Sequence, residues 1–135
     1  MARTSVPDAL AMRRLKYGEA TDAEREAVAE SLIAADRLAE AWLLYERRPG
    51  ASTVARLKRE ALQRGQTFLL LAMRRAGSEV SDAELTSAAK TAEAAGRFLD
   101  ARHAWVALGA KDELERIADE LPPRLRPAPD ETPSA

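Results

Sequence analysis

The chain contains two stretches that resemble one another, and this internal similarity constrains its fold more than any single residue does. The segment Leu10–Arg14 recurs as Leu71–Arg75, and after the loss of one residue the similarity continues at an offset of 60. The further matches are Thr21–Glu24 with Ser81–Glu84, Ala34–Ala41 with Ala94–Ala101, Tyr45 with Trp105, and Val54–Glu60 with Leu114–Glu120. Self-similarity at a long fixed period is typical of helical arrays, most of which present a surface to partners. We therefore interpret residues of about 8–65 and about 66–121 as tandem copies.

The composition argues against several classes of function. With 135 residues the chain is long enough for one cooperative domain but not for two. Its 21 basic and 22 acidic residues nearly cancel, so the net charge favours neither nucleic acid nor a membrane surface as a partner. The absence of cysteine excludes disulfides and thiolate catalysis and fits a reducing compartment. The first residues do not resemble a signal peptide. We therefore expect a cytoplasmic protein, and the abundance of Ala and Arg suggests a bacterial source.

Start and stop signals divide the chain into short helices. Ala, Leu, Glu and Arg, which favour helix, dominate almost everywhere, and no stretch reads as a strand. Thr21 and Ser81 each stand three residues before a glutamate, which is the spacing of a capping box. The expected helices cover about 8–17, 22–35, 38–48, 52–65, 68–75, 82–95, 98–108 and 111–121.

These helices predict an all-α fold, with seven or eight short helices in two tandem homologous units packed as a solenoid-like bundle. A single domain is expected over residues 1–121. From residue 122 to residue 135 the chain is rich in proline and poor in apolar groups, which predicts a disordered tail. The segment Pro122–Pro127 could instead be a proline-motif ligand, and the sequence leaves that alternative open.

One part of each copy resembles a known family. Ala95–Ala101, Trp105 and Leu108–Gly109 are similar to the middle of a tetratricopeptide or related α-solenoid repeat, in which a small residue and an aromatic flank the hairpin corner. The first copy has Asp36 where the family has glycine, and the period here is 60 to 61 residues, whereas the family repeats every 34 or so. The resemblance implies a helical scaffold that binds proteins and has no catalytic activity.

Catalytic and metal-binding patterns are missing from the sequence. His103 is the only histidine, and a lone histidine in an aromatic-bearing helix is more often a packed side chain than a base. No Glu-x-x-His pair or glycine-rich phosphate loop occurs. We therefore expect no enzyme activity, no catalytic residue, no metal and no cofactor.

One segment of the chain is strongly basic and supplies the candidate site. Residues 47–75 carry eight arginines and lysines against the single acid Glu60, whereas residues 19–46 are acidic. The equivalents of Lys58 and Arg59 in the second copy are uncharged or acidic, so packing alone does not demand the charge. The candidate partner-binding residues are Arg47, Arg48, Arg56, Lys58, Arg59, Gln63, Arg64 and Trp42.

Trp42 belongs to this set with two interpretations. It shares a helix face with Leu38 and Tyr45, which favours a place in the core. Its equivalent in the second copy is Arg102, which indicates that the position need not be buried and favours a partner contact.

The sequence therefore predicts an adaptor or scaffold that binds another protein, with an acidic segment or amphipathic helix as the expected partner and no membrane association. The basic residues could instead meet a nucleic-acid backbone in a small regulator, or be solvated, or pair with the acidic hairpin of the same chain. A third alternative is an accessory subunit of a larger enzyme complex. Two copies also leave open ends, which a homodimer would cover.

Overall fold

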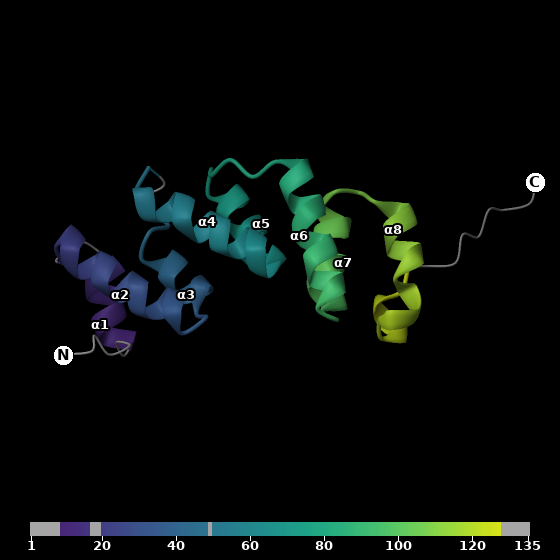
Figure 1. The fold of residues 1–135 in the computed structure, drawn as a ribbon, viewed down its shortest axis with the longest axis horizontal. Helices are drawn as coiled ribbons and strands as arrows, with labels where there is room; N and C mark the ends of the chain where they lie inside the picture. Colours follow the sequence, from purple (N-terminus) through teal and green to yellow (C-terminus); the bar gives the residue numbers. More distant parts are fainter. Residues whose placement is uncertain (1–8, 17–19, 49, 128–135) are drawn as a thin grey trace, which may run out of the picture.

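A computed structural model of the chain describes residues 9–16, 20–48 and 50–127. This part of the chain is helical throughout and contains no strand, which confirms the all-α fold class. Figure 1 shows the helices following one another along the longest axis of the molecule, from α1 to α8. The elements are α1 (Ala9–Lys16), α2 (Asp22–Ala34), α3 (Leu38–Leu43), α4 (Ser52–Arg64), α5 (Thr67–Arg75), α6 (Asp82–Ala94), α7 (Phe98–Ala107), α8 (Lys111–Arg116) and the 3-10 helices η1 (Ala118–Glu120) and η2 (Pro123–Leu125).

The helices pack in two series. Besides its neighbours in sequence, α4 contacts α2 and α6, and α5 contacts α3 and α7. From α2 to α7, even-numbered helices therefore pack on even-numbered ones and odd-numbered helices on odd-numbered ones. The helices α2, α4 and α6 are 13 residues long and begin at residues 22, 52 and 82, which are 30 residues apart.

Polar caps and left-handed corners explain where the helices begin and turn. The Thr21 hydroxyl accepts from the Glu24 backbone N–H at 3.1 Å, and Ser81 and Glu84 form the complete capping box. At the corner after α6, Gly96 has φ +75°, and Asp36 adopts φ +59° at the equivalent corner after α2. An aspartate tolerates this conformation better than most residues, and the Asp36 carboxylate accepts hydrogen bonds from Arg64 and Gln66.

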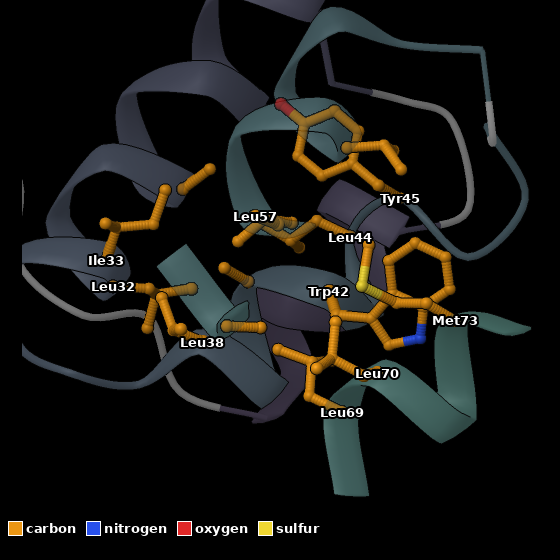
Figure 2. Close-up of a cluster of buried hydrophobic side chains, with 14 of the residues drawn as sticks. Leu32, Ile33, Leu38, Trp42, Leu44, Tyr45, Leu57, Leu69, Leu70 and Met73 are labelled. Atoms are coloured by element: carbon orange, nitrogen blue, oxygen red, sulfur yellow. The ribbon is translucent and has the colours of Figure 1, made fainter. Parts of the chain in front are cut away.

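The core consists of two clusters of buried apolar side chains. One contains side chains from α1 to α6, of which Figure 2 shows the central part, and the other lies around α6, α7 and the segment after α8. Ala41 and Ala101, at equivalent positions, are fully buried, so α3 and α7 can approach their neighbours closely. Tyr45 and Trp105 are buried as well.

A buried arginine, which the sequence analysis did not select, ties α1 to α2. The Arg25 guanidinium donates from Nε to the Leu15 carbonyl at 2.9 Å and from Nη2 to the Ala20 carbonyl at 3.3 Å, and it pairs with Asp22 at 2.9 Å. A buried charge is tolerated only when its donors are satisfied in this way. Arg25 therefore satisfies the Leu15 carbonyl in the last turn of α1, which has no partner within the helix, and the Ala20 carbonyl just before α2.

Two helix ends and the beginning of the tail differ from the sequence predictions. The helix expected to reach residue 48 ends at Leu43. After it, the backbone N–H groups of Leu44 and Tyr45 bond to carbonyls three residues back instead of four, and both side chains are buried. The last helix ends at Arg116 and continues as η1. The expected disorder from residue 122 does not begin there, because η2 forms and half-buried Leu125 packs on the second cluster. The rest of the expected tail, 128–135, lies outside the described residues.

Candidate partner-binding surface

The basic residues of α4 lie mostly in ion pairs with the helices on either side. Arg56 pairs with Glu30 of α2, and Lys58 pairs with Glu84 of α6 at 3.0 Å. Arg64 pairs with Asp36 at the α2–α3 corner and with Glu60 on its own helix. Such partly exposed pairs each stabilise a protein by about 0–1 kcal/mol. The arrangement is the intramolecular pairing that the sequence left open as one alternative, and it extends to α6 as well.

The remaining polar residues of the candidate set are spread over the molecule. Arg48 donates from Nη1 to the Lys16 carbonyl at 3.1 Å, which ties the turn after α3 to the end of α1. Arg47 is exposed in that turn. Arg59 and Gln63 lie one turn apart on the exposed side of α4, and neither makes an ion pair or a side-chain hydrogen bond with the described part of the chain. The structure therefore does not bring the selected residues together as one unoccupied basic surface.

Trp42 is in the core and not on a partner surface. Its side chain is only 3% exposed and belongs to the same buried cluster as Leu70 and Met73 of α5 (Figure 2). Arg102, its equivalent on α7, is half-buried instead, and donates from Nε to the Leu125 carbonyl at 3.1 Å. The difference follows from position: α5 packs on α3, whereas no further odd-numbered helix follows α7 in the described chain. The partner contact proposed for Trp42 is therefore wrong, and its interpretation as a core residue is confirmed.

The exposed apolar side chains gather on the odd-numbered helices, a feature that the sequence analysis missed. Within the described residues, the even-numbered helices expose no large apolar side chain. Single exposed apolar residues are common on proteins, but three of them on the two packed helices α5 and α7 indicate a surface. The exposed residues are Leu10 on α1, Leu43 on α3, Phe68 on α5, and Leu99 and Val106 on α7.

Helical spacing brings five residues together on α5 and α7. On α7, Leu99, His103 and Val106 are spaced at i, i+4 and i+7, so they share one side of the helix. On α5, Phe68 and half-buried Leu71 are likewise one turn apart. The Phe68 and His103 rings join the two helices, with their centroids 3.7 Å apart. Phe68, Leu99 and Val106 are 51%, 49% and 51% exposed. We refer to Phe68, Leu71, Leu99, His103 and Val106 as the apolar face.

Positive charge borders the apolar face. Arg75 lies two turns after Phe68 on the same side of α5, is exposed, and has no ion pair within the described residues. Arg102, on α7, is hydrogen-bonded to a backbone carbonyl rather than to a carboxylate. The helices α5 and α7 together contain a single carboxylate, Asp100, which Arg97 pairs with at 3.3 Å. The margin of the face therefore carries two cations, Arg75 and Arg102, against one further carboxylate, Glu120, which follows α8 and lies near the start of α7.

A shallow hollow adjoins the apolar face where α7 begins. It has a volume of about 390 Å³, and its walls include Phe98 and Leu99 together with Glu120 and Pro122 from the end of the chain. The hollow is large enough to receive side chains of a bound molecule.

Comparison with models of known protein families, with curated proteins and with solved structures finds no match. The function is therefore inferred from the surface itself. Among the described residues, no group of three or more acidic or histidine side chains is placed to hold a metal ion. In the same part of the chain, no helix has the length and apolarity needed to cross a membrane.

The apolar face contains one titratable side chain, His103. Partial burial, with a smaller contribution from Arg102, lowers the pKa of His103, and Asp100 opposes this shift. Below the ordinary histidine pKa of about 6.5 the unfolded chain therefore binds a proton more readily than the folded chain does. The stability contributed by neutral His103 is complete above the pKa of the unfolded state and is lost as the pH falls from there through the lower pKa of the folded state.

We expect the His103→Gln variant to lose less stability than the wild type when the pH falls from about 7.5 to about 5, because glutamine has no imidazole to protonate. Urea unfolding followed by circular dichroism at the two pH values measures both losses. Since all other titrating groups are shared, equal losses in the two proteins would contradict the lowered pKa.

Proposed function

We propose that the chain is a non-catalytic adaptor or scaffold that binds another protein through the apolar face. The proposal includes the architecture: a solenoid-like stack of helical hairpins in two homologous units. The sequence offset of 60 and the starts of α2, α4 and α6 at intervals of 30 residues support it. A cytoplasmic location is also part of the proposal and is supported by the cysteine-free composition.

The observation that carries the proposal is the confinement of exposed apolar side chains to the odd-numbered helices. Removing apolar surface from water favours association, and a few large side chains at the centre of an interface usually dominate its affinity. Phe68, Leu99 and Val106 are half-exposed on adjacent helices and could act in that way. The cations of α4, in contrast, are largely paired within the chain, which makes a nucleic-acid interface on that helix the weaker alternative.

Photo-crosslinking tests the adaptor function. A photoreactive phenylalanine analogue replaces Val106 in one protein and exposed Gln63 of α4 in a control, and both proteins are irradiated in nuclease-treated lysate of the source organism. We expect a discrete protein adduct at position 106 that disappears when Phe68→Ser is added, and none at position 63. An adduct only at position 63 would move the interface to α4. Adducts to nucleic acid in untreated lysate, with no protein adduct, would favour the regulator instead.

A further inference from the structure

The apolar face has a chemistry specific enough to define its partner. We infer that it binds an acidic amphipathic α-helix of another protein, whose apolar side lies on α5 and α7 and whose carboxylates face Arg75 and Arg102. The inference rests on the proposed adaptor function and adds the chemical class of the partner.

The spacing of the exposed apolar groups favours a helix as the bound element. The Phe68 and His103 rings meet at a tilted angle at the junction of α5 and α7, with Leu99 and Val106 one turn of α7 to either side of His103. Side chains at i, i+3, i+4 and i+7 of a partner helix form a stripe that covers such a two-helix surface, which is the usual helix-in-groove mode. The hollow beside Leu99, of about 390 Å³, offers a place for one of these side chains.

The charges around the face favour acidic residues on the partner. Arg75 is exposed and has no ion pair in the described chain, and Arg102 meets only a backbone carbonyl. The one carboxylate of these two helices, Asp100, is already paired with Arg97. Complementary charge at the rim of an interface raises the rate of association and selects the partner. Because Arg75 and Arg102 outnumber Glu120 beside the hollow, this rim favours an acidic helix over a basic helix with the same apolar stripe.

Neither the chain's own ends nor a second copy fits this surface as well. Residues 128–135 contain two acids but no large apolar side chain. Residues 1–8 contain only two large apolar side chains, Met1 and Val6. In a symmetric dimer the same patch meets itself, so Arg75 and Arg102 would oppose the same cations of the second copy. An acidic helix supplies both the apolar area and the opposite charge.

A peptide-display selection against the immobilised full-length protein tests the inference. The probe is a library of random 18-residue peptides, and the selected sequences are then synthesised with a fluorescent label for anisotropy titrations. We expect enrichment of sequences with net negative charge and apolar residues at i, i+3, i+4 and i+7. Binding is expected to weaken at least tenfold for Phe68→Ser with Val106→Ser and about five- to tenfold for Arg75→Glu. The Arg75→Lys variant should keep most of the affinity.

Lys90→Glu is the matched control, because Lys90 is also an exposed cation without an ion pair in the described chain but lies on α6, away from the apolar face. It should leave the affinity unchanged, and circular dichroism verifies that all variants are folded. The acidic partner would be overturned if the selected peptides are neutral or basic, or if Arg75→Glu leaves their affinity unchanged. Either result would leave the adaptor function intact. Peptides that bind the Phe68→Ser, Val106→Ser variant as well as the wild type, or failure to enrich any peptide, would count against both. Self-association in sedimentation equilibrium that Phe68→Ser abolishes would assign the face to a second copy instead.

Discussion

The Trp42→Ala variant is expected to lose about 3–5 kcal/mol of unfolding free energy, which is the usual cost of deleting a large aromatic side chain from a core. Trp42 is 3% exposed and shares its cluster with Leu70 and Met73, so truncation would leave a cavity between α3 and α5. Surrounding side chains fill such a cavity only in part. Urea unfolding followed by circular dichroism gives the free-energy difference directly.

Leu43→Ala provides the control for this variant. Leu43 is the next residue on the same helix, but its side chain is 40% exposed, so its truncation is expected to cost less than about 1 kcal/mol. The comparison separates the free-energy cost of removing a buried side chain from the cost of placing alanine anywhere on α3. A loss for Trp42→Ala no larger than that for Leu43→Ala would contradict the core position and return Trp42 to the candidate partner contacts.

Local signals in the sequence were sufficient to predict the helices. The caps at Thr21 and Ser81 act within one turn of the chain: each hydroxyl accepts from the backbone N–H of the glutamate three residues on, and Ser81 with Glu84 completes the capping box. The left-handed corner at Gly96 has the same local origin, since only the residue's own backbone decides it. Where the predicted end of a helix failed, after Leu43, the reason was tertiary, because burial of Leu44 and Tyr45 is achieved by tighter turns.

The candidate site was harder to predict because it depends on contacts between residues far apart in the sequence. The Phe68 and His103 rings are in contact although 35 positions separate them, and no local pattern predicts that α5 and α7 lie side by side. The charge run of residues 47–75 was visible, but its ion pairs with Glu30 and Glu84 follow from the packing of α2 and α6 on α4. One signal was available: Phe68 and Val106 occupy helix positions opposite the buried alanines and leucines of α5 and α7, which helical periodicity could have identified.

Comparison of Trp42 with Arg102 shows what an internal repeat can and cannot predict. Equivalent positions share backbone geometry, as the Asp36 and Gly96 corners do, but their burial also depends on what packs next to them. α5 covers Trp42, whereas Arg102 lies on the last odd-numbered helix and meets the end of the chain. A residue that differs between two copies can thus record a change of neighbour rather than a functional site.

The Gly65→Ala variant is expected to be almost as damaging as Trp42→Ala. Gly65 ends α4 with φ +63°, and a Cβ atom there would lie 2.8 Å from the Ala92 backbone nitrogen and 2.9 Å from the Ala88 carbonyl oxygen of α6. The left-handed conformation costs an alanine about 1–2 kcal/mol. Displacing the α6 backbone adds a further cost of about 1–3 kcal/mol. We therefore expect a total loss of about 2–5 kcal/mol in urea unfolding.

Gly109→Ala isolates the contribution of the contact, because Gly109 has φ +65° but no atom within 4 Å of the position its Cβ would take. This control should lose only the conformational cost of about 1–2 kcal/mol. The difference between the two variants then measures how closely the end of α4 approaches α6. Equal losses would show that the approach is looser than the distances to Ala88 and Ala92 indicate. A larger loss for Gly65→Ala would establish that position 65 requires glycine for packing as well as for backbone conformation.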